Sequence, residues 1–271
     1  MEFIRDWYFD FGIMGDSFDV VLKGFWFTIK LAVVSGILSL LWGLVLAVLR
    51  QLPGRPLAPV RWLTIGYIDV FRGIPALLVL LLISGFLPAA QADGAIPESL
   101  GLPTWFGQPT WFWYGVMGLT LTYGAYMAEV YRAGIEAVPN GQTEAARSLG
   151  MSHAQAMRYV IVPQAIRKVI PPLLNDFIAL MKDTSLVFAI GGSEVVDAGF
   201  DIQSDLFNGS AFTLGAIFYL IVTIPLARLV DRLIAREQRR TQRGGAPRDG
   251  GGGEEPPPLA APSGAPAGGP A

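Results

Sequence analysis

Residues 136–172 read EAVPNGQTEAARSLGMSHAQAMRYVIVPQAIRKVIPP, a polar and basic segment between two strongly apolar stretches. Its first half predicts a turn at Pro139, followed by a short helix. Strong helix formers run from Glu144 to Leu149, and Gly150 follows them. Glycine is the residue that most often follows a helix end, because it adopts a left-handed backbone conformation without steric cost. We therefore expect a helix that ends at Gly150.

The second half of the segment predicts another short helix. Ser152 and Gln155 have the spacing of a capping box, in which each side chain binds the other residue's backbone N–H. We expect Pro163 to end this helix, because proline lacks the N–H that a helix interior needs. Two short helices joined at a glycine form a compact loop.

The composition around this loop is that of a membrane protein. Of the 271 residues, 52% are hydrophobic and 15% are charged, whereas about a quarter of the residues in a soluble domain are charged. The absence of cysteine excludes disulfides and thiolate chemistry. His153 is the only histidine, which argues against a histidine-built metal site. We expect no metal and no cofactor.

Five stretches have the length and apolar character of membrane spans. A helix needs about 20 mostly apolar residues to cross the hydrocarbon, where its backbone must satisfy its own hydrogen bonds. Four of the stretches contain no charge: residues 31–49, 73–92, 111–128 and 206–227. The fifth, residues 169–192, is apolar on average but contains charged side chains. Arg72 to Pro75 predicts a kinked entry into the second span.

The loop charges predict an orientation. Basic residues mark cytoplasmic loops, and they follow the first, third and last stretches. The other two loops, 93–98 and 193–205, carry acidic residues only. The sequence therefore predicts an all-α integral membrane protein with five transmembrane helices, the N-terminus outside and the C-terminus inside, and a two-helix cytoplasmic loop.

Three regions follow from this topology. Residues 1–19 form an external N-terminal segment, and residues 20–236 form the membrane domain, with the loop at 139–163. Residues 237–271 form a cytoplasmic tail that is basic at first. From Gly244 onward the tail is rich in Gly, Pro, Ala and Ser. We expect it to be disordered, because such a composition buries too little apolar area to offset the entropy of ordering.

The loop resembles a known family. Glu144-Ala145-Ala146, then Gly150, then Val160 to Pro163, resembles the EAA loop of ATP-binding-cassette (ABC) importer permeases, with valine at 160 and 162 where Ile and Leu are usual. Other stretches are similar to the polar amino-acid branch of these permeases, including FRGIP at 71–75, GAYMAE at 124–129 and KDTSL at 182–186. The resemblance covers roughly residues 20–236.

This resemblance implies a type I importer permease in a bacterial plasma membrane, where it translocates amino acids or related small polar solutes. It implies a second permease chain, identical or a sibling, a cytoplasmic ATP-binding-cassette subunit and an external solute-binding protein. The ATPase subunit would grip the loop at Glu144, Ala145, Ala146, Gly150 and Pro163. The chain has no GxxxxGK[ST] phosphate loop, so we expect a partner to bind and hydrolyse ATP. We expect contact with membrane lipid and none with nucleic acid.

Polar side chains within the apolar spans are the candidate solute pathway, because a charge in hydrocarbon is costly and usually faces protein or a water-filled cavity. These residues are Glu129, Asn175, Asp176, Lys182, Asp183 and Thr184. Helical spacing puts Asp176 and Asp183 on one face, and Asn175 and Lys182 on another. Two alternatives remain open: these groups lock helices together, and Glu129 pairs with Arg132 at the interface. Two prolines at 171–172 predict a helix start or break.

Two other function classes are compatible with a multi-span protein. An ion-coupled secondary transporter or channel often shows inverted repeats and paired broken helices, and five spans with one basic cytoplasmic loop do not suggest that architecture. A membrane-embedded enzyme needs a nucleophile with its base, or a metal constellation. The sequence contains no such arrangement.

Overall fold

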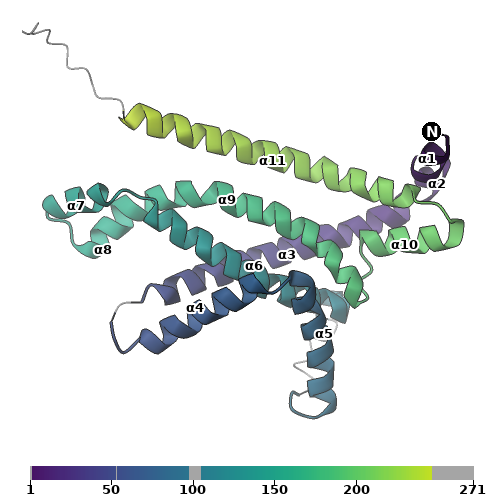
Figure 1. Ribbon diagram of the computed structural model, residues 1–271, viewed down its shortest axis with the longest axis horizontal. Helices are drawn as coiled ribbons and strands as arrows, with labels where there is room; N and C mark the ends of the chain where they lie inside the picture. Colours follow the sequence, from purple (N-terminus) through teal and green to yellow (C-terminus); the bar gives the residue numbers. More distant parts are fainter. Residues whose placement is uncertain (1, 53, 98–104, 246–271) are drawn as a thin grey trace, which may run out of the picture.

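The computed structural model describes residues 2–52, 54–97 and 105–245, and its regular elements are all helical (Figure 1). The α-helices are α1 (Glu2–Tyr8), α2 (Phe11–Asp16), α3 (Phe18–Arg50), α4 (Ala58–Gly73), α5 (Ala76–Ala92), α6 (Thr110–Glu136), α7 (Asn140–Ser148), α8 (His153–Ala156), α9 (Val162–Asp183), α10 (Val195–Leu206) and α11 (Ser210–Gly245). The other helical elements are the 3₁₀ turns η2 (Trp105–Gly107) and η4 (Thr184–Ile190) and the π-helix η3 (Met157–Ile161).

The core lies where α3 crosses α6. Leu31 of α3 and Leu119 of α6 are completely buried. Close approach of the two backbones depends on glycine: a Cβ at Gly43 would lie 2.8 Å from the Cβ of Met127 and 2.9 Å from the carbonyl oxygen of Gly124. Small residues at such crossings let membrane helices gain dispersion energy at short range. The α3–α6 pair therefore forms the centre against which the other helices pack.

Candidate membrane-spanning helices are present. Helices α3 and α11 are long and apolar enough to cross a membrane. Helices α4 and α5 would make a third span if they are taken together as one bent element. The bend between them is 107°, with the break at Ile74 and Pro75, where the sequence predicts a kink. The predicted all-helical architecture is therefore confirmed for the described residues, and it contains candidate membrane spans.

The predicted break at Pro171 and Pro172 is wrong. Helix α9 runs without interruption from Val162 to Asp183 and contains both prolines. Tertiary packing explains the continuity: the Cγ1 of Val169 occupies the place that a side chain at Gly134 of α6 would need. Where a membrane helix packs on its neighbours, the backbone groups freed by proline can be satisfied locally.

Helices are present in both terminal regions of the described chain. The N-terminal helices are tied to the start of α11: the N–H of Gly209 donates to the carbonyl of Trp7 at 2.9 Å, and the N–H of Asp10 donates to the hydroxyl of Ser210 at 2.9 Å. Helix α11 continues through Gly245, so the basic segment from residue 237 is helical. The predicted disordered run starts at Gly244; its first two residues are helical, and the rest lies outside the described residues.

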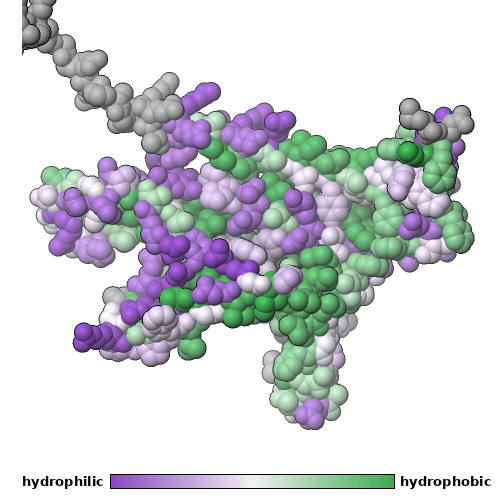
Figure 2. Space-filling view, in the orientation of Figure 1, coloured by the Kyte–Doolittle hydropathy of each residue, from purple (hydrophilic) through white to green (hydrophobic). Residues whose placement is uncertain are grey.

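The hydropathy of the surface changes along the molecule. In the view of Figure 2, hydrophobic residues cover α5 and the adjoining middle of the molecule, whereas hydrophilic residues gather over α7 and α8. Exposed apolar side chains such as Leu82 and Ile221, at 63% and 62% exposure, lie on α5 and α11. This distribution fits an apolar band that faces lipid and a polar end that carries the α7–α8 loop.

Candidate coupling loop and polar helix faces

The α7 end has the geometry of a Schellman motif. Gly150 has a φ of +84°, and its N–H donates to the carbonyl of Arg147 at 3.0 Å. The N–H of Met151 donates to the carbonyl of Ala146 at 3.2 Å. These two bonds satisfy carbonyls that the helix end would otherwise leave free, and they require a left-handed residue at position 150. The predicted glycine stop is confirmed.

The second helix also begins as predicted. The hydroxyl of Ser152 accepts from the N–H of Gln155 at 3.2 Å, and the amide oxygen of Gln155 accepts from the N–H of Ser152 at 2.8 Å, which makes a capping box. The predicted end at Pro163 is wrong. Helix α8 passes into the π-helix η3 and then into α9, and Pro163 lies in the first turn of α9. The missing N–H is tolerated because the π-helix directly before Pro163 interrupts the regular i→i−4 hydrogen bonds there.

Helix α7 presents one face to solvent and packs the other against α8 and η3. Ala146 is 4% exposed, whereas Glu144 and Ala145 are exposed. Leu149 is 84% exposed, and the sequence pattern did not single it out as a contact residue. The outer face of α7 is therefore the part of the loop available for contact.

Glu129 lies at the centre of a charge cluster. Its carboxylate pairs with Arg50 of α3 and with Arg132, whose guanidinium nitrogen lies 2.7 Å away, and Arg72 of α4 approaches to 4.0 Å. We call these four residues the arginine cluster. It joins the ends of α3 and α4 to α6, and it includes the predicted Glu129–Arg132 pair. A half-buried carboxylate shared by several guanidinium groups holds the helix ends in one arrangement.

The charged residues of α9 are divided between two faces, as helical spacing predicts. Asp183 accepts a 2.8 Å hydrogen bond from the hydroxyl of Tyr123 on α6. Asp176 acts electrostatically on the same tyrosine, and its Oδ2 is buried without a hydrogen-bond partner among the described residues. Because Asp176 and Asp183 lie one heptad apart, both belong to the α9 face directed toward α6.

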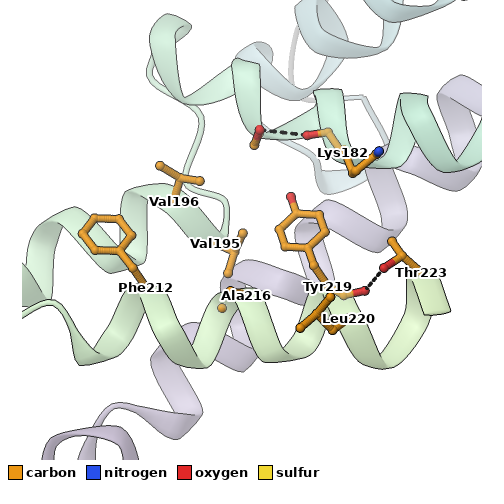
Figure 3. A pocket seen from close by; sticks show the side chains of 10 residues that line it. Lys182, Val195, Val196, Phe212, Ala216, Tyr219, Leu220 and Thr223 are labelled. Atoms are coloured by element: carbon orange, nitrogen blue, oxygen red, sulfur yellow. Dashed lines mark hydrogen bonds between the residues drawn. The ribbon is translucent and has the colours of Figure 1, made fainter. Parts of the chain in front are cut away.

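Asn175 and Lys182 lie on the other face, along α11. Lys182 lines a pocket of about 460 Å³ together with Ser185, Tyr219 and Thr223 (Figure 3). Asn175 lines a second pocket, of about 500 Å³, closer to the α7–α8 loop. Thr184 is fully buried, and its hydroxyl donates to the carbonyl of Met181 at 2.7 Å. The four candidate residues of α9 thus lie on two sides of that helix.

Glu194 is a buried acid. In the sequence it is one of several acidic residues of the 193–205 loop, and nothing there indicates that it is buried. It is 1% exposed, it caps α10 by accepting from the N–H of Val196 at 2.8 Å, and the hydroxyl of Thr28 lies 3.5 Å from its other oxygen. Burial raises the pKa of Glu194 to about 8, against the opposing effect of the backbone N–H groups. The carboxyl therefore binds a proton at a higher pH than a solvated glutamic acid does. No local pattern marks it, because its burial comes from α3.

The family follows from a sequence match over most of this architecture. Residues 39–241, from the middle of α3 to near the end of α11, match the family described as "Binding-protein-dependent transport system inner membrane component". The chain belongs to this family. The match includes the α7–α8 loop, the arginine cluster and the polar faces of α9.

Similar proteins support this membership of the transport family. The chain is 34% identical over 232 residues to the probable glutamine ABC transporter permease protein GlnM of Bacillus subtilis, covering 83% of this chain and 96% of that protein. It is 31% identical over 229 residues to the glutamate/aspartate import permease protein GltK of Escherichia coli O6:H1, covering 84% and 98%. The predicted resemblance to ABC permeases is confirmed, and no ion-coupled transporter appears among these relatives.

Solved structures agree on the fold. A crystal structure of an amino acid ABC transporter with histidines has a chain that superposes with a TM-score of 0.72 at 34% identity, covering 84% of this chain and 98% of that one. Inward-facing MetNI, a methionine ABC transporter, gives a TM-score of 0.63 at 19% identity and supports the fold alone. This family member is a transport component, a permease subunit, and a separate subunit hydrolyses ATP.

Proposed function

We propose that this permease carries amino acids, or closely related small polar solutes, into a bacterial cell as part of an ABC importer in the plasma membrane. The observation that supports the solute class is the match to named amino-acid permeases over more than four-fifths of the chain. A solved amino-acid transporter with a TM-score of 0.72 supports it further. The family description accounts for the inner-membrane location.

The proposed topology has five spans: α3, the α4–α5 pair, α6, α9 with η4, and α11. The N-terminus lies outside and the C-terminus inside. The positive-inside rule supports this orientation, because basic residues of the arginine cluster lie at the C-terminal ends of α3 and α4, whereas Asp197 and Asp201 lie on α10. Single cysteines at Ala95 and Ser204 should react with an impermeant thiol reagent outside the cell. Reaction of a cysteine at Gln242 under the same conditions would contradict the orientation.

The α7–α8 loop is the proposed contact with the ATPase, and we call it the coupling loop. Its exposed Glu144, Ala145 and Leu149 would meet the cassette subunit, while Gly150 sets the shape. The other predicted coupling residue, Pro163, supports the loop from the first turn of α9. Two permease chains and an external solute-binding protein complete the proposed assembly.

For the solute we propose a route past the polar faces of α9. On one face of α9, the carboxylates of Asp176 and Asp183 can bind the ammonium group of a substrate. On the other face, the cation of Lys182 and the amide of Asn175 can bind the carboxylate of the substrate. Glu129 and Thr184, the remaining candidates, are already engaged, with arginines and with the α9 backbone. We therefore assign the direct solute contacts to the four residues of α9.

We expect Asp183→Asn to reduce transport by about tenfold or more without loss of assembly, since a hydrogen bond to a charged group contributes about 1.5–3 kcal/mol. Tyr123→Phe removes the other partner of the same 2.8 Å bond and should have a smaller effect if the carboxylate itself meets solute. Asp205→Asn, which changes an exposed acid at the end of α10 that lines neither of the two pockets, is the control. Normal uptake by Asp183→Asn and Lys182→Ala would place both residues in helix packing instead.

Reconstitution tests the function as a whole. The permease, its cassette subunit and its binding protein are incorporated into liposomes, and uptake of a radiolabelled amino-acid mixture is competed with single amino acids. We expect uptake to require ATP and all three components. Uptake by the permease alone, driven by an ion gradient, would overturn the proposal.

A further inference from the structure

Lys30 is a cation held within the span α3 by uncharged groups. Its ammonium lies 3.8 Å from the centre of the Phe27 ring and donates to the side-chain oxygen of Gln108 at 3.2 Å. Within the described ranges, no Asp or Glu lies at ion-pair distance from it. A charge in a membrane helix is costly, and such residues are usually paired. Among the described residues, this positive charge therefore has no countercharge.

An apolar pocket lies directly beside this lysine. It has a volume of about 410 Å³ and lies between α3 and the start of α6, with Ile29, Val33 and Trp113 among its walls. Lys30 and Gln108 supply its polar groups. Val33 is 44% exposed, so this wall is open to the surroundings of the helix bundle. The site therefore combines a cation at one end with an apolar groove.

The rim of the pocket has unusual backbone and surface features. Phe106 is 90% exposed, has a φ of 53°, and its ring lies 6.0 Å from that of Trp113. Trp26 is 61% exposed on the α3 side. Left-handed backbone is unusual for a bulky residue and has a steric cost. Exposed aromatic rings beside a cation are typical of the boundary between hydrocarbon and lipid headgroups.

We propose that this pocket binds a membrane phospholipid, with the phosphate against Lys30 and one acyl chain along Ile29, Val33 and Trp113. Charge complementarity selects an anion, and the apolar walls select one that carries a hydrocarbon chain. A phospholipid supplies both. The position of Lys30, in the half of α3 away from the coupling loop, assigns the lipid to the outer leaflet. This leaflet assignment rests on the proposed topology, but the binding itself does not.

Lipid binding can be measured on the purified permease–ATPase complex in detergent, by native mass spectrometry and by thermal unfolding. The probes are phosphatidylglycerol, diacylglycerol with the same acyl chains, and inorganic phosphate. We expect phosphatidylglycerol to remain bound and to raise the midpoint of unfolding. We expect diacylglycerol and inorganic phosphate to bind at least tenfold more weakly.

Two variants separate the charge from the groove. Lys30→Met keeps the length of the side chain but removes the charge, and Val33→Trp fills the groove at an exposed position. Both should weaken phosphatidylglycerol binding about tenfold. Lys23→Met is the matched control, because Lys23 is an exposed lysine of the same helix that lines a different pocket. It should bind lipid as the unmodified protein does.

Four outcomes would overturn the proposal. These are unchanged binding in Lys30→Met, equal binding of diacylglycerol, equal stabilisation by inorganic phosphate, and displacement of the lipid by a transported amino acid, which would assign the pocket to the solute route. Because binding is measured without transport, a failure of the lipid site stays distinguishable from a failure of the proposed function.

Discussion

Gly150→Val should reduce ATP-driven transport at least tenfold while the permease still inserts into the membrane. The φ of +84° at Gly150 is unfavourable for a side chain with a Cβ by about 1–2 kcal/mol, and a β-branched residue there is a genuine outlier. Relief of this strain breaks the two hydrogen bonds that close α7. The exposed face of the coupling loop then moves away from its partner.

The measurement is co-purification of the ATPase together with solute-stimulated ATP hydrolysis in vesicles. Gly141→Val is the matched control, because Gly141 lies in the same helix with no positive φ, and a Cβ added there would meet no atom within 4 Å. Ala145→Trp tests the contact itself, since Ala145 is exposed and a larger side chain would overfill an ATPase groove. If Gly150→Val and Ala145→Trp both transport normally, this loop does not couple ATP hydrolysis to transport.

Gly43→Leu should prevent stable accumulation of the permease. A Cβ at this position meets the backbone of α6 at 2.9 Å and 3.1 Å, in addition to the Cβ of Met127. Backbone cannot move aside as the end of a flexible side chain can, so α3 and α6 must separate. Overpacking of a core typically costs about 1–3 kcal/mol, and this crossing is the centre of the fold.

Thermal unfolding of the purified complex and the yield of folded protein from membranes test this expectation. Gly66→Leu is the control, because a Cβ at this position of α4 meets nothing within 4 Å. Gly43→Ala should show an intermediate loss, since even one methyl group collides with the α6 backbone. Equal yields of Gly43→Leu and Gly66→Leu would mean that the α3–α6 contact does not limit stability.

Local features of the coupling loop were predictable because they depend on neighbouring residues alone. The capping box of Ser152 and Gln155 and the left-handed Gly150 are properties of a few consecutive residues, and both are present. The kink at Ile74 and Pro75 likewise depends on consecutive residues, and it is present. The prolines at 163, 171 and 172 were not predictable in this way, because their effect depends on what surrounds the helix.

The sequence by itself determined the helical membrane class, the two-helix loop and its family, since these depend on composition, spacing and short motifs. Only the tertiary structure decided which polar groups meet. It brings Arg50 and Arg72 to Glu129 from distant parts of the chain, and it buries Glu194 against α3. It also turns Asp183 toward Tyr123 and Lys182 toward α11. Helical periodicity sets which residues share a face, but the partner of each face depends on how helices distant in sequence pack.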